Sequence, residues 1–331
     1  EAVVIDIIIR RRRGGGRRAR GEGGRVSVNT RARLRGRSVG LAVGDAVGTT
    51  VEFRPRGTFV PLADMLGGGP FGLNPGEWTD DTAMALCLAT SLVECGGFDP
   101  RDQMVRYVRW HEQGYLSSNG RCFDIGSTVR RALAQFKRTG EPFSGSADPQ
   151  SAGNGSLMRL APVALYYYPD REQTWHYAVE SSRTTHAAPE CLDACRYFSD
   201  LLYRALSGES KADLLGASPL EGSLSPAVAA VARRGYMSKA REQIHGTGYV
   251  VASLEAALWC FWKTDSFREA ILTAANLGDD ADTTAAICGQ LAGAYYGEGG
   301  IPPAWLDKLV MRDEIATLAE HLCRASSAPQ T

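Results

Sequence analysis

The sequence of 331 residues predicts a single compact all-α domain. About a dozen segments carry apolar residues at helical spacing. No convincing run of alternating apolar and polar residues, the pattern of a half-buried strand, follows the N-terminal region. No segment recurs at a fixed period, so the sequence does not indicate a repeat protein.

The N-terminal region differs from the rest in composition. Residues 1–37 contain twelve Arg and only three acidic residues, with glycines interleaved. Nothing periodic appears before Leu34. We therefore expect a basic, disordered arm at residues 1–35, a single domain at 36–325 and a short tail at 326–331. The arm could bind an acidic surface, or it could reflect the choice of start site.

The first helix of the domain carries glycine at positions 36, 40, 44 and 48. Glycines at this spacing form a smooth stripe on one face, which lets another backbone approach closely, at a cost of about 1 kcal/mol of helix propensity each. Apolar runs, N-caps and breakers define the other helices. These are expected at residues 82–93, 100–110, 127–137, 191–206, 250–262, 285–296 and 313–322, with another beginning near Leu157.

The strongest chemical signal is an acidic segment before the apolar run at residues 285–296. Asp280, Asp282 and Thr283 lie within four residues. Residues two apart do not share a helix face, so the two carboxylates can converge only from a loop or a helix cap. Mg²⁺ and Mn²⁺ prefer such oxygen ligands. The segment is therefore either half of a metal site or an acidic helix N-terminus without a metal.

A second segment has the same chemistry. Thr79, Asp80 and Asp81 precede the uncharged run at residues 83–93, with Thr79 in the expected N-cap position. An exposed cap explains one such segment, whereas two suggest that both helix starts meet over shared cations. We expect two divalent cations, Mg²⁺ or Mn²⁺, held by Thr79, Asp80, Asp81, Asp280, Asp282 and Thr283.

Five segments in order resemble the ADP-ribosylglycohydrolase family. They span roughly residues 41–297, and the closest resemblance is to the bacterial dinitrogenase-reductase-activating and ADP-ribosylarginine hydrolase branch, to which Arg121-Cys122-Phe123-Asp124-Ile125-Gly126 adds. The resemblance implies an orthogonal helical bundle with metals in a cleft. The segments are GDAVG at 44–48, WTDDT at 78–82, GNGSLMR at 153–159, TTH at 184–186 and GDDADT at 278–283.

The resemblance also implies roles for residues outside the metal segments. Glu52, Asp80 and Asp124 are the candidates for activating water or protonating the leaving group, although a loop acid or a helix N-cap would explain Glu52 and Asp124 equally well. Glycines in the GNGSLMR segment permit positive φ and expose N–H groups for a diphosphate or ribose. The implied substrate-binding residues are Gly153, Asn154, Gly155, Ser156, His186, Gly248 and Tyr249.

These features favour a metal-dependent hydrolase that releases ADP-ribose from a modified arginine side chain. Three alternatives remain open at this point. The bond could be O-linked, to serine or within poly-ADP-ribose. The protein could be a non-catalytic, crystallin-like family member, or a metal phosphohydrolase.

Composition limits the partners and the compartment. The net charge is zero, and outside the arm the chain is mildly acidic, which is no footprint for nucleic acid. Eight Cys without a CxxC pair read as buried reduced thiols and favour the cytoplasm. No apolar run is long enough to span a membrane. We expect a monomer whose partners are an ADP-ribosylated protein and the product ADP-ribose.

Overall fold

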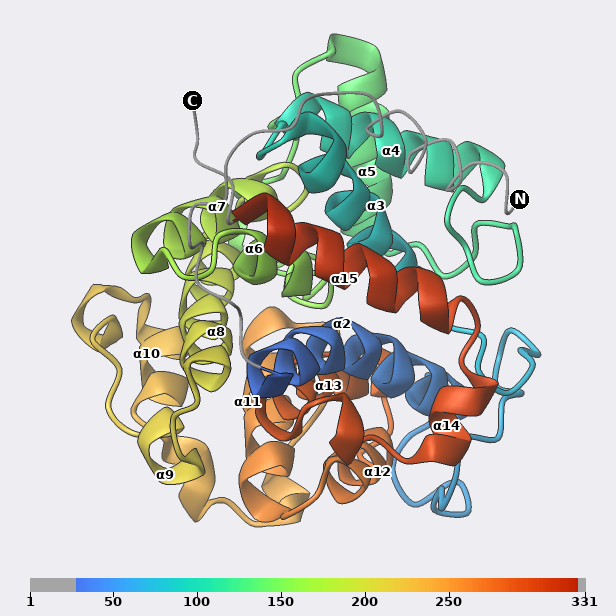
Figure 1. Ribbon diagram of the computed structural model, residues 1–331, viewed down its shortest axis with the longest axis vertical. Coiled ribbons are helices and arrows are strands. Elements are labelled where there is room, and N and C mark those ends of the chain that lie inside the picture. Colours follow the sequence, from blue (N-terminus) through green and yellow to red (C-terminus); the bar gives the residue numbers. More distant parts are fainter. Residues whose placement is uncertain (1–27, 327–331) are drawn as a thin grey trace.

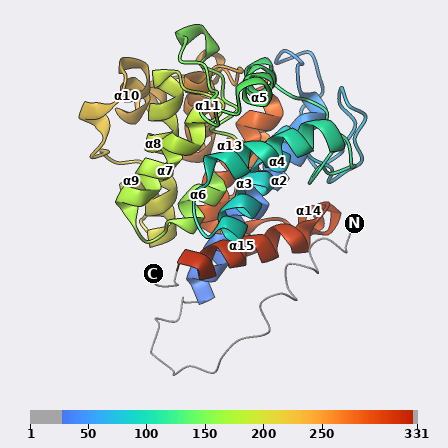
Figure 2. The same cartoon turned by 90° about the horizontal axis from the view of Figure 1, so that it is seen from above.

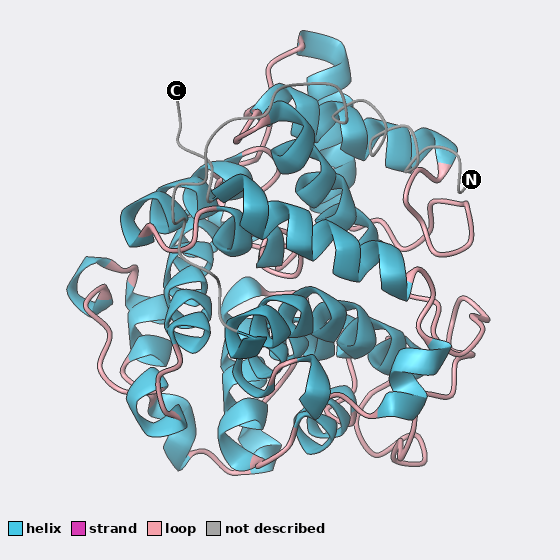
Figure 3. Cartoon of the chain, in the orientation of Figure 1, coloured by secondary structure: helices cyan, strands magenta, loops and turns pink. Residues whose placement is uncertain are grey.

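Helices make up the regular secondary structure of residues 28–326, the part of the chain that the computed structural model describes. Figure 3 shows this part as helices joined by loops, without a strand, which confirms the all-α prediction. The α-helices are α2 (Val28–Gly48), α3 (Asp80–Cys95), α4 (Pro100–Gln113), α5 (Ser127–Thr139), α6 (Ala161–Tyr166), α7 (Arg171–Arg183), α8 (Pro189–Ser207), α9 (Lys211–Leu214), α10 (Pro226–Ala232), α11 (Val250–Lys263), α12 (Phe267–Ala275), α13 (Ala281–Tyr296), α14 (Pro303–Lys308) and α15 (Arg312–Ser326).

Helices α2 and α13 form the most extensive helix pair and lie side by side in Figure 1. The glycine stripe of α2 faces the backbone of α13. A Cβ atom at Gly40 would lie 2.4 Å from the carbonyl oxygen of Gly289, and one at Gly44 would lie 2.1 Å from that of Ala285. The expected close approach of a second backbone is therefore confirmed, and its partner is the helix that begins next to Asp280.

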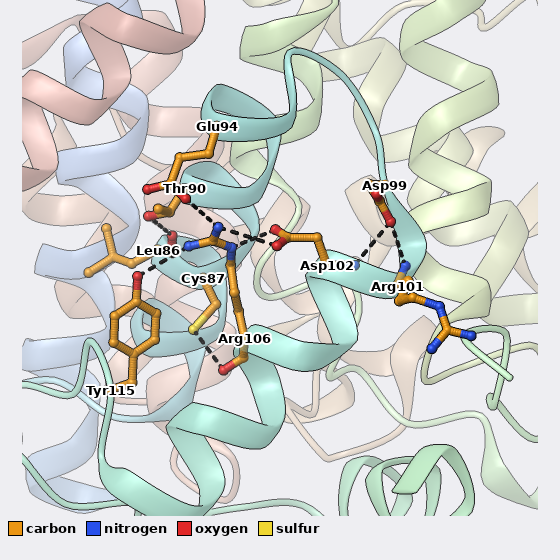
Figure 4. Close-up of polar contacts among 9 residues, drawn as sticks. All are labelled: Leu86, Cys87, Thr90, Glu94, Asp99, Arg101, Asp102, Arg106 and Tyr115. Atoms are coloured by element: carbon orange, nitrogen blue, oxygen red, sulfur yellow. Dashed lines mark hydrogen bonds and ion pairs between the residues drawn. The ribbon is translucent and has the colours of Figure 1, made fainter. Parts of the chain in front are cut away.

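Helix α3 is almost wholly buried and is covered by α4, α6 and α15. Figure 2 shows α15 running along the outside of α2 and α3. On the α4 side, Arg106 donates to Asp102 at 2.6 Å and pairs with Glu94 at the end of α3 (Figure 4). The Asp99 carboxylate caps α4 by accepting from the N–H groups of Arg101 and Asp102. The predicted start of this helix is thus confirmed.

Several boundaries differ from the prediction, and two of these differences have a clear physical cause. Helix α2 begins at Val28, so part of the expected 1–35 arm is helical; tertiary contact stabilises it, since Arg33 donates to the carbonyl oxygen of Ala205 at 2.8 Å. Residues 1–27 and 327–331 lie outside the described residues. The helix expected near Leu157 begins at Ala161, because a turn held by the Asn154 carbonyl occupies the intervening residues.

Within residues 28–326, no helix combines the length and the apolar character that a bilayer-spanning helix requires.

Candidate metal centre and substrate loops

The N-termini of α3 and α13 meet, as the two acidic segments predict. The Thr79 hydroxyl lies 3.2 Å from Oδ2 of Asp282, and the Thr283 hydroxyl lies 3.3 Å from Oδ2 of Asp81. Each helix start therefore supplies a hydroxyl to a carboxylate of the other. Trp78 anchors the α3 segment from behind, because its indole N–H donates to the carbonyl oxygen of Val310 at 3.1 Å.

Asp45 on α2 fixes the start of α3, a role that the sequence did not reveal. Its carboxylate accepts from the backbone N–H and the hydroxyl of Thr79, both at 2.9 Å, and from the same groups of Thr82 at 3.1 and 2.6 Å. Thr79 occupies the N-cap position, but its own side chain makes no capping bond. The cap comes from another helix, and the Thr79 hydroxyl that donates to Asp45 also lies 3.2 Å from Asp282 of the acidic centre.

Three carboxylates from two segments converge in this centre. One oxygen of each of Glu52, Asp280 and Asp282 lies within 4.8 Å of the others. Asp280 is the N-cap residue of α13 and Asp282 lies in its first turn. The two carboxylates therefore converge from a helix cap, as expected from their spacing. Glu52 follows the short 3₁₀ helix Thr49–Val51. Glu52 therefore lies among the acids expected to bind metal.

Asp124 reaches the same centre from the loop before α5. Its φ is 53°, and the N-cap of α5 is Gly126, so Asp124 is not the cap of that helix. Without a bound cation, burial and the charge of Asp280 raise the pKa of Asp124 to about 7. Burial and the charge of Asp124 raise the pKa of Glu52 to about 10. Without a cation, the pKa values of these two carboxyl groups therefore lie at or above 7.

The remaining acids are buried against one another. Burial, followed by the charges of Asp124 and Asp81, raises the pKa of Asp80 well above its usual range. Burial and the charge of Asp45 act in the same direction on the pKa of Asp81. Burial and the charge of Glu52 likewise raise the pKa of Asp282.

The donor atoms fit a hard divalent cation. No basic side chain pairs with any of these acids among residues 28–326. In the same part of the chain, Oδ1 of Asp81 and Oε2 of Glu52 are buried without a hydrogen-bond partner. Uncompensated buried carboxylates are costly. Their all-oxygen donor set is what Mg²⁺ and Mn²⁺ bind.

The loop at residues 153–156 lies beside this centre. The Asn154 side chain donates to Oδ2 of Asp280 at 2.7 Å and to the Ser253 hydroxyl at 2.8 Å. Its backbone N–H donates to the carbonyl oxygen of Gly248 at 3.1 Å. The two predicted substrate segments, 153–156 and 248–249, are therefore joined to each other and to one acid of the centre.

The positive φ expected for the glycines of this loop is not observed. Neither Gly153 nor Gly155 has positive φ; instead, a Cβ atom at Gly155 would lie 2.9 Å from Cε1 of His186. The buried His186 ring packs beneath the loop, with Nδ1 2.8 Å from the Thr185 hydroxyl. Burial and the nearby Arg159 lower the pKa of His186 to about 3, so the ring is neutral.

Two other residues of the GNGSLMR segment, Ser156 and Arg159, make hydrogen bonds within the protein. The Ser156 hydroxyl is buried and accepts from the Ser182 hydroxyl at 2.8 Å. Arg159, which sequence reasoning did not single out, donates to the carbonyl oxygen of Gly155 at 3.1 Å and to the Thr185 hydroxyl at 2.7 Å. Tyr249 is 41% exposed.

An all-α fold with a buried cluster of carboxylates between two helix N-termini is typical of a class of helical hydrolases that use acidic centres. Within that class, the chain belongs to the ADP-ribosylglycohydrolase family, whose model matches residues 27–331. It is accordingly a glycohydrolase.

The relatives include both of the expected bacterial types. The chain is 46% identical over 290 residues to "ADP-ribosylarginine hydrolase Tri1" of Serratia proteamaculans, covering 88% of this chain and 78% of that protein. It is 47% identical over 290 residues to the protein of the same name from Pseudomonas putida, covering 88% and 77%. Similarity to the "ADP-ribosyl-[dinitrogen reductase] glycohydrolase" of Rhodospirillum rubrum is lower, at 32% over 286 residues, covering 85% and 92%.

The fold has a solved counterpart. A chain described as "ADP-ribosylglycohydrolase-related protein complex" superposes with a TM-score of 0.80 at 45% sequence identity. The match covers 90% of this chain and 99% of that chain. The bundle predicted from the motifs is therefore confirmed.

Proposed function

We propose that this protein is a divalent-cation-dependent hydrolase that removes ADP-ribose from modified arginine side chains. One observation carries the proposal: an all-oxygen cluster of buried acids, without a basic partner in residues 28–326, contains two carboxylate oxygens that lack a hydrogen bond. Relatives that share 46–47% of their residues with this chain are named ADP-ribosylarginine hydrolases. The linkage is inferred from these names.

Two Mg²⁺ or Mn²⁺ ions are the proposed cofactors. Bound cations would neutralise the acids, orient ribose hydroxyls and stabilise charge that develops when the glycosidic bond breaks. Thr79 and Thr283 each bring a hydroxyl to a carboxylate of the other helix start and complete the oxygen set. The residues that would hold the ions are Thr79, Asp80, Asp81, Asp280, Asp282 and Thr283, with Glu52 as an additional ligand candidate.

The proton-transfer groups of the proposed reaction are carboxyls with raised pKa values. Burial and neighbouring negative charge raise the pKa values of Glu52 and Asp124. A carboxyl group with a raised pKa can donate or accept a proton near neutral pH. Asp80, buried in the same cluster, is the third candidate. One of these groups assists the attacking water or the departing arginine.

The substrate loops hold the ADP-ribose part. Asn154 links the loop to Asp280 and so positions the ribose relative to the acids. The N–H groups of Gly155 and Ser156 donate to no backbone carbonyl within residues 28–326, which leaves them free for a phosphate oxygen. The proposal also assigns Gly153, Gly248 and Tyr249, which lie next to Asn154 and its partner segment, to the binding of ADP-ribose. His186 packs against Gly155 and would act on the ligand indirectly, by holding the loop in position.

The cellular setting is also a proposal. The eight cysteines are all free thiols, five of them buried, which fits a reducing cytoplasm. We infer a monomer that acts on an ADP-ribosylated protein and does not bind nucleic acid.

Release of ADP-ribose from arginine-modified and serine-modified proteins, measured side by side, tests the function. We expect release from the arginine substrate with Mg²⁺ or Mn²⁺, and none after chelation, with an unchanged far-UV circular dichroism spectrum. Asp282→Asn should lower turnover by at least roughly 10- to 100-fold, the usual loss when a metal site is perturbed. Asp307→Asn is the matched control, since Asp307 is 75% exposed.

Each alternative gives a different result. Full turnover in chelator would contradict the cation requirement, and preferential release from serine would contradict the arginine linkage. Release of inorganic phosphate with the glycosidic bond intact would indicate a phosphohydrolase. Absence of release from either substrate would indicate a non-catalytic protein.

A further inference from the structure

Three phenylalanines from separate segments form a continuous aromatic group, here called the aromatic rim. The Phe53 and Phe71 ring centroids are 6.2 Å apart at 78°, and those of Phe71 and Phe123 are 5.2 Å apart at 51°. Phe53 is 62% exposed. Phe71 and Phe123 are half-buried, so the group presents one exposed ring supported by two others. An apolar group that reaches the surface can mark a binding site. Neither the proposed metal centre nor the substrate loops use this group.

The rim is attached to two acids of the centre, Glu52 and Asp124. Phe53 directly follows Glu52, and Phe123 directly precedes Asp124. In both places the chain turns sharply, with φ of 60° at Phe53 and 53° at Asp124. As a result, the Glu52 carboxylate is buried in the centre while the ring of the next residue faces solvent.

The conformation at Phe53 is held in place. Positive φ is rare for a bulky residue and costs about 1–3 kcal/mol, so it persists only where the surroundings enforce it. The N–H of Phe53 donates to the carbonyl oxygen of Asp279 at 2.7 Å, and the N–H of Asp279 donates to that of Arg54 at 2.9 Å. These two bonds tie the rim to the loop that carries Asp280.

The charge beside the rim indicates the chemistry of its ligand. The face of an aromatic ring attracts cations, most strongly planar guanidinium groups. Here the rings adjoin carboxylates that have no basic partner in the described chain. The nearest arginine in sequence, Arg54, is engaged elsewhere, since its guanidinium stacks over Phe59 at 5.5 Å and donates to the Thr58 carbonyl. The negatively polarised face of an aromatic ring does not attract a diphosphate anion.

We propose that the aromatic rim binds the guanidinium of the modified arginine and thereby selects arginine over serine as the attachment residue. The inference rests on the proposed function. The ADP-ribose part then occupies the loops around Asn154 and Gly248, which contact Asp280. The guanidinium is bonded directly to the anomeric carbon, so it lies beside Glu52 and Asp124, where the three rings adjoin these acids. The rim is a binding and specificity element and takes no part in proton transfer.

Two substitutions at one ring separate a cation site from a simple apolar contact. Phe71→Leu keeps the apolar character but removes the ring, whereas Phe71→Trp keeps an aromatic face. We expect Phe71→Leu to raise KM for an ADP-ribosylated arginine peptide about five- to tenfold, as expected for one cation–π contact, with kcat little changed. Inhibition by agmatine, a free guanidinium compound, should weaken by the same factor, and Phe71→Trp should retain both.

Inhibition by ADP-ribose provides the internal reference and should be unchanged in Phe71→Leu. Val60→Ala is the matched control, because Val60 is 86% exposed in the same region and lies outside the rim. Thermal melting of each variant confirms folding. Unchanged KM and agmatine inhibition in Phe71→Leu would overturn the inference, and so would a selective weakening of ADP-ribose inhibition, which would assign the rings to adenine. If wild-type protein released no ADP-ribose from arginine, the proposed function itself would fail, an outcome that these variants do not share.

Discussion

Arg37, in the middle of α2, is fully buried, and none of its three guanidinium nitrogens has a hydrogen-bond partner within residues 28–326. Burial lowers its pKa from 12.5 to about 9. A buried cation without a partner destabilises the folded state. Unlike the acids of the centre, it faces no group of opposite charge within the described residues, and we expect it to lower stability.

Arg37→Met should therefore stabilise the protein. Replacing a buried charged group by an apolar side chain of similar length raises the free energy of unfolding by about 1–4 kcal/mol in comparable cases. Denaturant unfolding measures the change, with Arg233→Met at an exposed position as the control, where no change is expected. A loss of stability in Arg37→Met would show that the guanidinium has a compensating partner.

At the scale of elements, the glycine face of α2 sets the geometry of the centre. The helix carries Asp45 and leads to Glu52, while α13 carries Asp282 and Thr283. Backbone contact between the two helices therefore fixes the distance between Glu52 and Asp282. Replacing a glycine of this contact by a residue with a Cβ atom would separate the two helices and move these acids apart.

Gly44→Ala tests this contact. On helix propensity alone, alanine should stabilise the helix by about 1 kcal/mol. The new Cβ atom, however, would lie 2.1 Å from the carbonyl oxygen of Ala285, so the helices must separate. We expect a net loss of about 1–3 kcal/mol in the free energy of unfolding, together with reduced turnover. Gly222→Ala, at a position with no atom within 4 Å, should change neither. Increased stability of Gly44→Ala would mean that the two helices are farther apart.

The elements and site residues that could be predicted are those set by residues close together in the sequence. Helix starts at Asp80 and Pro100 follow from acids and caps adjacent in sequence, and the glycine period predicts a close helix contact. The contacts that could not be predicted are long-range. Asp45 binds the N-cap residue of α3, Thr79, which is 34 residues away in sequence. The ring that requires glycine at position 155 belongs to His186.

At the scale of the whole molecule, the centre links distant parts of the chain. Its acids come from α2 and the residues that follow it, the start of α3, the loop before α5 and the start of α13. A cation bound there would stabilise only the folded arrangement. Binding at a hundredfold excess over the dissociation constant would add about 2.7 kcal/mol to the free energy of unfolding. Stability therefore reports on cation binding independently of catalysis.

The pH dependence of stability should differ between metal-free and metal-bound protein. Folding raises the pKa of Asp124 to about 7 and that of Glu52 to about 10, so between pH 7 and 8 the metal-free folded state retains protons that the unfolded state has released. Its free energy of unfolding should fall as pH rises, by about 1.4 kcal/mol per pH unit for each retained proton. His186, with its lowered pKa, acts at more acidic pH and does not affect this interval. Saturating Mg²⁺ or Mn²⁺ replaces the protons, so the slope should vanish and the stabilisation by cation should grow with pH. Urea unfolding at pH 7 and pH 8, with chelator and with cation, measures both slopes. A metal-free protein that is equally stable at the two pH values would show that these carboxyl groups are ionised without a cation.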